Sequence, residues 1–261
     1  MMGNKTVKLN GFLIAVLAAV ILFALSFFDS LALTEYPVIT PYLKHIIYLG
    51  LIYSVLAVSL NIVSGNIGQV SLGHAAFYGF GAITSAVLTL YYNVPYWIAF
   101  MTAGLLTGLV GIPLGLPALR IRGHFLVVVT YGFAEVLRII TLNSEFTGGP
   151  AGLPGLKAPT IFGKSFNDFG VSGKEAYILA AFVLLVFLTF LLSRIEKSRV
   201  GLAWAAIRED EIAATTMGVD VAYYKLLAFA LSAAFAGFAG SLFAHYSASI
   251  SSETMSSNES I

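Results

Sequence analysis

Long apolar segments constrain the fold of this chain more than any other feature of its sequence. Seven of them are long enough to span all or most of a bilayer: 11–28, 43–63, 70–90, 96–116, 124–142, 175–193 and 224–246. A helix rises about 1.5 Å per residue, so such segments reach about 30 Å, the thickness of the hydrocarbon core. The segments are continuous rather than alternating, which excludes β-barrel strands. We therefore predict an all-α, polytopic transmembrane helix bundle with about seven spans.

The composition agrees with this prediction and narrows the function. Hydrophobic residues make up 58% of the chain and charged residues only 10%. The chain has no cysteine, which excludes disulfides, thiolate metal sites and a cysteine nucleophile. Its four histidines are too scattered to suggest a metal site, and no catalytic triad or basic nucleic-acid patch is visible. We predict that the chain is not an enzyme and binds no metal and no nucleic acid.

The placement of Lys and Arg predicts a cytoplasmic N-terminus. With that orientation the cytoplasmic side receives nine of them: Lys5, Lys8, Arg120, Arg122, Arg194, Lys197, Arg199, Arg208 and Lys225. The outer side receives four: Lys44, Lys157, Lys164 and Lys174. Loop 143–173 is then extracytoplasmic and loop 194–222 cytoplasmic. The first segment could be a signal peptide cleaved near Ala32, but its length favours an uncleaved anchor.

The outer loop is rich in turn-forming residues between Thr147 and Gly155. This stretch is either a flexible spacer or a lid or docking surface at the outer mouth. Further along, Gly163-Lys164-Ser165 resembles the end of a phosphate-binding loop, but Ala158 occupies the position of the first glycine. We therefore expect no cofactor on this chain, and any ATP to be bound by another subunit.

A short polar break, Ser64 to Gln69, separates the second and third segments. Breaks of this kind are tolerated at membrane depth where the backbone lines a cavity or is buried by protein. They predict a possible solute pathway at five residues: Gly65, Gln69, Ser71, Gly73 and His74. The alternative is a tight turn that leads into a closely packed helix. His74 alone is better explained as a packed histidine bonded to neighbouring backbone.

Small residues recur at helical spacing in two segments and predict close helix packing. They are Gly104, Gly108, Gly111 and Gly115 in one segment, and Ala233, Gly237 and Ser241 in the other. In the fifth segment, Glu135 and Arg138 lie three residues apart and are expected to form an ion pair on one helix face. A place on the solute path is the less favoured alternative for this pair.

A charged region interrupts the apolar pattern between Arg194 and Lys225, which holds ten of the 27 charged residues of the chain. Asp210 suits an N-cap, Glu211 the positive end of the helix dipole, and Gly218 a C-terminal stop, which predicts a short helix over 211–217. Residues 199–208 predict a preceding amphipathic helix, with Leu202, Trp204 and Ala206 available to contact the bundle. The alternative is a solvated connection without further function.

This region also resembles a known family. Residues 213–218 resemble the Glu-Ala-Ala-x-x-x-Gly loop of ABC importer permeases, although Ile212 stands where that pattern has Glu. More specifically, residues 199–211 resemble the corresponding loop of LivM-type permeases of branched-chain amino-acid transporters. Segments 68–77, 147–153 and 224–240 resemble the same family, so that the likeness covers about residues 40–250. In the family a further apolar span follows the segment that resembles Ile250–Ile261, and this chain is expected to lack it.

The resemblance implies one transmembrane permease domain over 1–261, in the inner membrane of a prokaryote, that imports branched-chain or related amino acids. It implies a second permease subunit, two cytoplasmic ATP-binding subunits and an extracytoplasmic solute-binding protein as partners. The residues implied to couple the permease to the ATPase subunits are Arg199, Gly201, Arg208, Glu209, Asp210, Glu211, Ala213, Ala214 and Gly218. The alternatives are a permease for urea, amides or sugars, and a truncated membrane remnant that transports nothing.

Overall fold

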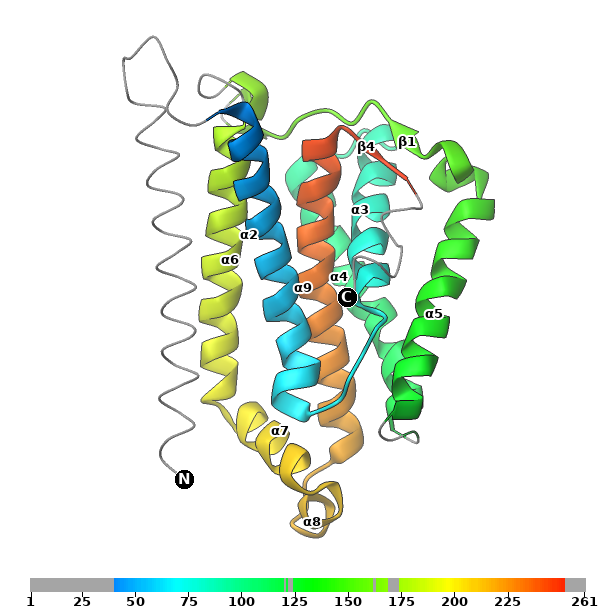
Figure 1. Cartoon of the computed structure of the whole chain (residues 1–261), viewed down its shortest axis with the longest axis vertical. Coiled ribbons are helices and arrows are strands. Elements are labelled where there is room, and N and C mark those ends of the chain that lie inside the picture. Colours follow the sequence, from blue (N-terminus) through cyan, green and yellow to red (C-terminus); the bar gives the residue numbers. More distant parts are fainter. Residues whose placement is uncertain (1–39, 120, 122–123, 162, 169–173, 252–261) are drawn as a thin grey trace. The chain divides into compact units, whose positions relative to one another are not determined.

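The computed structural model describes residues 40–119, 121, 124–161, 163–168 and 174–251. The first predicted span, 11–28, and the segment after residue 251 lie outside the described residues. Long helices dominate the rest (Figure 1): α2 Pro41–Asn61, α3 His74–Leu90, α4 Tyr96–Ala118, α5 His124–Asn143, α6 Glu175–Glu196 and α9 Val221–Ser247. The shorter elements are η1 Ile62–Ile67, η2 Glu145–Thr147, η3 Gly149–Ala151, β1 Leu153–Pro154, β2 Thr160–Ile161, β3 Lys164–Ser165, η4 Phe166–Asp168, α7 Arg199–Glu209, α8 Glu211–Thr216 and β4 Ser249–Ile250.

Five of the described helices are long and apolar enough to cross a membrane: α2 with η1, α4, α5, α6 and α9. The predicted all-α, polytopic membrane bundle is confirmed. The remaining long helix, α3, is apolar but has only 17 residues. It begins at His74 rather than at the predicted residue 70, because Gly68 adopts a left-handed φ of 80° and the chain runs without regular structure to Gly73. The break predicted at Ser64–Gln69 therefore extends further than expected.

The described residues form two compact units, and the first comprises residues up to Ser54 together with 160–187. In this unit, Lys44 donates to Glu175 Oε1 at 2.7 Å, and Lys44 is only 2% exposed. The pair joins the first turns of α2 and α6, and each charge offsets the desolvation of the other. Tyr177 packs edge-on against both Tyr48 and Phe166 beside it.

In the second unit, residues 55–159 and 188–251, helix α9 packs most extensively on α4 and α3. The four predicted glycines of α4 all face α9, which confirms the packing prediction. A Cβ added at Gly111, for example, would lie 2.6 Å from the Ala233 Cβ. On the α3 side, a Cβ at Gly240 would collide with the Tyr78 carbonyl oxygen, and one at Gly81 with the Gly237 backbone. These helices therefore touch through their backbones.

At one end of this unit, which we call the β1–β4 end, the loop after α5 folds back onto the bundle. Strand β1 pairs antiparallel with β4, so that Leu153 opposes Ile250. Leu153 and Leu156 are buried in an apolar cluster with side chains of α3 and α9. Gly152 has a φ of 70°, and a Cβ there would collide with the Ile250 carbonyl. This part of loop 143–173 is therefore packed on the bundle, which disfavours a flexible spacer.

Candidate functional site at the α7–α8 end

Helices α7 and α8 lie at the opposite end of the second unit, which we call the α7–α8 end (Figure 1). Ser198 caps α7 by accepting a hydrogen bond from Val200 N at 3.2 Å. Asp210 caps α8 by accepting from Ile212 N and Ala213 N at 2.7 and 3.0 Å. Gly218 follows α8 with a φ of 83°, a conformation that favours glycine. The predicted short helix and its cap are confirmed, with α8 ending at Thr216.

Helix α7 packs on the bundle through one face. Trp204 is fully buried and donates from Nε1 to the Tyr224 carbonyl at 3.0 Å, which ties α7 to the start of α9. Ala203 and Ile207 are buried on the same face, whereas Ala206 is half-buried. The prediction for Leu202 was wrong, because this side chain is 69% exposed. Each helical residue turns by about 100°, so Leu202 points almost opposite to Trp204.

Arg208 ties α7 to the π-helical turn η1 that ends α2. Its Nη1 donates to the Gly65 carbonyl at 2.6 Å. Its side-chain stem covers Gly68, where an added Cβ would lie 3.1 Å from Arg208 Cγ. Carbonyls at the end of a helix lack intrahelical donors, and the guanidinium supplies one. The structure thus brings together two residues that the sequence assigned to separate roles, Arg208 in the loop and Gly65 on a solute pathway.

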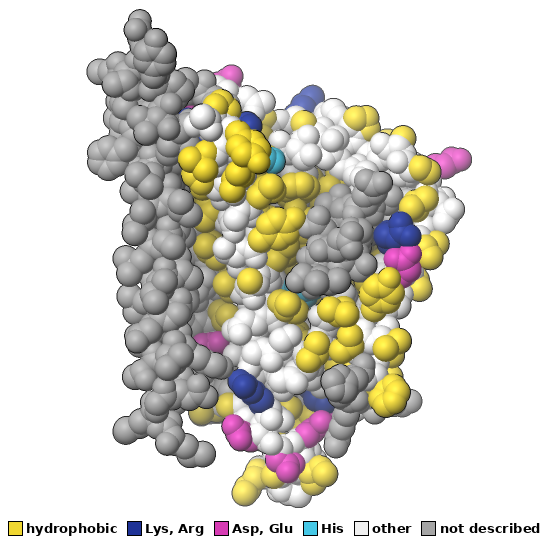
Figure 2. All heavy atoms as spheres, in the orientation of Figure 1, with side chains coloured by type: hydrophobic (Ala, Val, Ile, Leu, Met, Phe, Trp, Pro, Cys, Tyr) yellow, Lys and Arg dark blue, Asp and Glu magenta, His cyan; other side chains and the backbone are white. Residues whose placement is uncertain are grey.

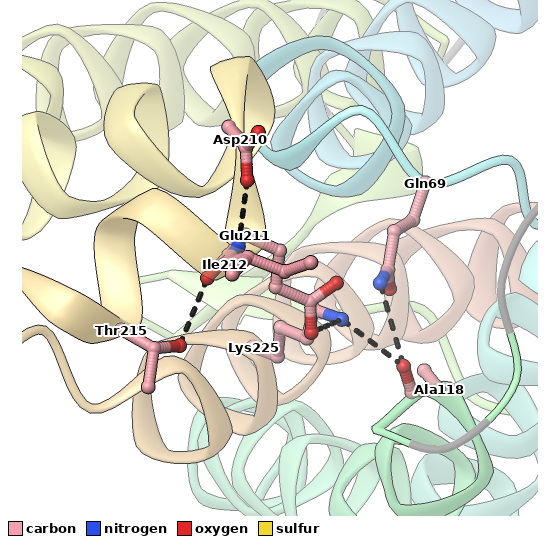
Figure 3. A network of polar contacts seen from close by, with 7 residues as sticks. All are labelled: Gln69, Ala118, Asp210, Glu211, Ile212, Thr215 and Lys225. Carbon is pink, nitrogen blue, oxygen red and sulfur yellow. Dashed lines mark hydrogen bonds and ion pairs between the residues drawn. The ribbon is translucent and has the colours of Figure 1, made fainter.

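A buried lysine joins three more elements at this end (Figure 3). Lys225 is 1% exposed, and its Nζ donates to Glu211 Oε1 at 2.8 Å and to the Ala118 carbonyl at 3.3 Å. Gln69 Nε2 donates to the same carbonyl at 3.4 Å. Ala118 is the last residue of α4, where the helix dipole is negative and favours a cation. We call these four residues, Gln69, Ala118, Glu211 and Lys225, the Lys225 network.

A hollow of about 250 Å³ lies beside this network. Polar and charged side chains of Gln69, Arg208, Glu211 and Lys225 line it together with apolar residues, which are Ile67, Val70, Leu126, Val127 and Ile207. Glu211, expected from the sequence to be a coupling residue, therefore turns toward the interior of this end. Within the described part of the chain, no three His, Asp or Glu side chains are placed to hold a metal ion.

The outward side of α7 and α8 combines apolar and charged side chains. Leu202, Ile212 and Met217 are 69%, 65% and 86% exposed. Six predicted coupling residues are also exposed, whereas Gly201 and Ala214 are buried. The six are Arg199, Arg208, Glu209, Asp210, Ala213 and Gly218. Figure 2 shows apolar side chains at the tip of this end with acidic and basic side chains next to them. We call Leu202, Ile212 and Met217 the apolar tip.

The other predicted pathway residues, Ser71, Gly73 and His74, lie away from α7 and α8, at the start of α3. A Cβ at Gly73 would lie 2.7 Å from the Thr130 carbonyl of α5, so this contact requires glycine. His74 is buried, and its Nε2 lies 2.7 Å from the Ser59 Oγ, a side-chain rather than a backbone partner. The structure thus divides the five predicted residues into two places, and their pathway role stays a prediction.

Sequence reasoning did not identify Ser59 and Lys225, the buried residues that hold His74 at one place and adjoin Gln69 at the other. Ser59 is fully buried, and its hydroxyl donates to the Leu56 carbonyl at 2.7 Å while its own carbonyl accepts from Ser232 at 2.7 Å. Lys225 was counted only as a positive charge for the topology. A lysine near the start of an apolar helix needs a counter-charge, and this was the available signal.

The ion pair predicted in α5 is present. Arg138 donates from Nε to both carboxylate oxygens of Glu135, at 3.1 and 3.0 Å, and from Nη2 to Oε1. Both side chains are about one-third exposed, and no other element is needed to explain the pairing. A structural ion pair accounts for these two charges.

Comparison with known proteins identifies the family. The model of the branched-chain amino acid transport system / permease component matches residues 42–261. The high-affinity branched-chain amino acid transport system permease protein LivM of Salmonella typhimurium is 41% identical over 229 residues, or 80% of this chain and 54% of the relative. LivM of Escherichia coli is 41% identical over 231 residues, or 81% of this chain and 54% of the relative.

The chain thus spans about half the length of these curated relatives. No solved structure matches it. The chain belongs to the family of branched-chain amino acid transport permease components.

Proposed function

We propose that this chain is a permease subunit of an ATP-driven importer of branched-chain or related amino acids. Its place would be the inner membrane of a prokaryote, with the N-terminus in the cytoplasm. Family membership, five apolar helices of spanning length and the printed names of the two LivM relatives support this proposal. The solute would cross the bundle without any covalent change.

The observation that carries the proposal is the exposure of the apolar tip at the α7–α8 end. Ile212 and Met217 are largely exposed in and directly after α8. Two exposed acidic residues, Glu209 and Asp210, directly precede this helix. Lipid would not solvate these charges, and water would not favour the apolar side chains, so a protein partner fits both. An ATP-binding subunit is the partner expected here, since the sequence has no phosphate-binding loop of its own.

The other partners follow from the family. A second permease subunit would contact the exposed apolar faces of the spanning helices, where Phe125 and Val128 of α5 are 77% and 69% exposed. A solute-binding protein would deliver the amino acid at the β1–β4 end, where the loop after α5 is packed and ordered enough to act as a docking surface. Lipid would cover the remaining apolar surface.

Substitution of the apolar tip tests the proposal. Ile212→Ser with Met217→Ser is expected to reduce co-purification with the ATP-binding subunits at least about tenfold, because the removed side chains would form the centre of the interface. Tyr92→Ser, which removes a large exposed side chain near the end of α3, is the control and should leave this co-purification unchanged. Equal co-purification of both variants would contradict docking at α7–α8.

The transported solute needs a separate measurement. Uptake of radiolabelled leucine by vesicles that contain the complete complex should be inhibited by isoleucine and valine. Uptake of labelled urea, an amide or a sugar instead would assign the chain to a different solute, and no uptake of any of them would favour a remnant that does not transport.

A further inference from the structure

Among the described residues, Lys225 is the charge most withdrawn from water at the α7–α8 end. Its side chain is 1% exposed, and its bonds reach two elements besides its own helix, the carboxylate of Glu211 in α8 and the last carbonyl of α4. Gln69, from the segment between η1 and α3, shares that carbonyl. Three helices, α4, α8 and α9, therefore meet at one ammonium group, and Gln69 joins them through the shared carbonyl (Figure 3).

The bond between Lys225 and Glu211 attaches α8 to the start of α9. Of the six residues of α8, only Ala214 is buried, and Glu211 is half-buried. The remaining four are exposed: Ile212, Ala213, Thr215 and Thr216. By contrast, α7 is attached independently through Trp204 and Arg208. Loss of the Glu211 bond would therefore weaken the attachment of α8 and leave that of α7 in place.

The two partners of this ion pair differ in their access to water. Glu211 retains 21% exposure of its side chain, so water can hydrate its carboxylate if the pair opens. Lys225 cannot be hydrated in place, because its side chain is almost fully enclosed. If α8 moves, the ammonium group must therefore follow the carboxylate or lose its counter-charge. Movement of α8 is thereby transferred to the ends of α4 and α9.

We propose that Lys225 is a positioning residue that acts through Glu211 and transmits movement of α8 to the bundle. The proposal rests on the proposed function and deepens it, since it separates two tasks within one loop. The outward face of α8 binds the ATP-binding subunit. Glu211, on the inward side, passes the resulting displacement to Lys225 and the Ala118 carbonyl.

Two substitutions of similar shape test this role in the complete transport complex reconstituted in vesicles. Glu211→Gln and Lys225→Met each remove one charge and leave the apolar tip intact. We expect the ATP-binding subunits to assemble as in the wild type. The number of solute molecules imported per ATP hydrolysed should fall about five- to tenfold, because the coupling free energy between the two events is reduced. If these residues had a purely structural role, the variants would lower the yield of assembled complex and leave the number of solute molecules imported per ATP unchanged.

Conservative and matched variants complete the test. Lys225→Arg keeps the charge and is expected to retain most of the wild-type solute per ATP. Glu209→Gln removes an equal charge from the exposed end of α7 and should alter binding of the ATP-binding subunits rather than the transport ratio. If a single variant does not assemble, the double variant Glu211→Gln/Lys225→Met, which leaves no buried charge, is measured with the same expectation.

The outcomes distinguish this proposal from the proposed function. A wild-type transport ratio in Glu211→Gln and Lys225→Met, or in the assembled double variant, would overturn the role of Lys225 and leave docking at α7–α8 untouched. Loss of docking in the apolar-tip variants together with a lowered ratio in the charge variants would support both. Unchanged docking in the apolar-tip variants would reject the docking surface alone.

Discussion

The two ends of the α3–α4–α9 bundle are held together by different chemistry. At the α7–α8 end, the connections are charge-assisted: Arg208 to the Gly65 carbonyl at 2.6 Å and Lys225 to Glu211 at 2.8 Å. At the β1–β4 end they are neutral. His245 bonds the Lys157 carbonyl through Nδ1 at 2.8 Å and lies 3.1 Å from the Ser85 hydroxyl through Nε2.

The surroundings of these connections differ as well. The β1–β4 end adds a strand pair and an apolar cluster that includes Leu153, Leu156 and Ile250, all nearly inaccessible to water. The α7–α8 end exposes most of α8 and one side of α7. Arg208 is exposed and Glu211 is partly exposed, so water can hydrate these two side chains if their bonds open, whereas water gives buried apolar contacts no such compensation. The α7–α8 end is therefore the more hydrated of the two, and the β1–β4 end is the more tightly packed.

The largest expected effect comes from the contact that both ends share, the α3–α9 packing. Gly240→Ala should lower the free energy of unfolding by about 3 kcal/mol, because the new Cβ collides with the Tyr78 carbonyl. Gly132→Ala in α5 is the matched control, since its added Cβ meets nothing within 4 Å. Thermal unfolding in detergent should show a large decrease for the first variant and no decrease for the second. Similar melting temperatures would contradict direct backbone packing.

Within the α7–α8 end, the two halves of the ion pair should differ in stability. Glu211→Gln is expected to cost about 3 kcal/mol, since it leaves Lys225 buried without a counter-charge. Lys225→Met is expected to cost about 1 kcal/mol, because the remaining Glu211 can be hydrated. Thermal unfolding of both single variants and of the double variant gives the interaction free energy between the two side chains. A double variant as unstable as the sum of the two would show that the groups act independently.

At the β1–β4 end, His245→Phe tests the neutral connection. The ring volume is kept, but the Lys157 carbonyl and the Ser85 hydroxyl lose their partner, at an expected cost of about 2 kcal/mol. Amide hydrogen exchange should increase at residues 153–157 and stay unchanged in α8. Increased exchange in α8 as well would mean that the two ends are not independent in their local stability.

An effect as small as that of Lys225→Met is expected at the α8 cap. Asp210→Ala removes the acceptor for Ile212 N and Ala213 N and should cost about 1 kcal/mol. Because α8 is a short exposed helix, faster hydrogen exchange should be confined to residues 211–217. Asp210→Ser, which can also cap a helix, is the control and should restore most of the protection. Equal exchange in both variants would indicate that the cap contributes little.

Local features of this fold were predictable from the sequence, because each depends on neighbouring residues. Asp210 and Gly218 bound α8 as expected, and the glycine spacing of α4 correctly placed one face against another helix. The same holds for the ion pair of Glu135 with Arg138, three residues apart.

Features that join distant parts of the chain were not predictable in this way. The bond from Arg208 to Gly65 spans 143 residues, and the bond from His245 to Lys157 spans 88. The exposure of Leu202 depends on how α7 is rotated against the bundle, which residue types alone leave open because both faces of this helix carry apolar side chains. Lys225 had several acids within reach in sequence, and only the packing of α8 against α9 selects Glu211.

Helix α9 carries both kinds of connection, with Lys225 and His245 about 30 Å apart along its axis. If α9 tilted by about 10° around its midpoint, each of these residues would shift by about 2.5 Å in opposite directions. A hydrogen bond of 2.8 Å is lost after a shift of about 0.7 Å. A modest tilt would therefore break the connections at both ends together, unless α8 and the loop at Lys157 follow the helix. The orientation of α9 thus sets the positions of two surfaces on opposite ends of the unit.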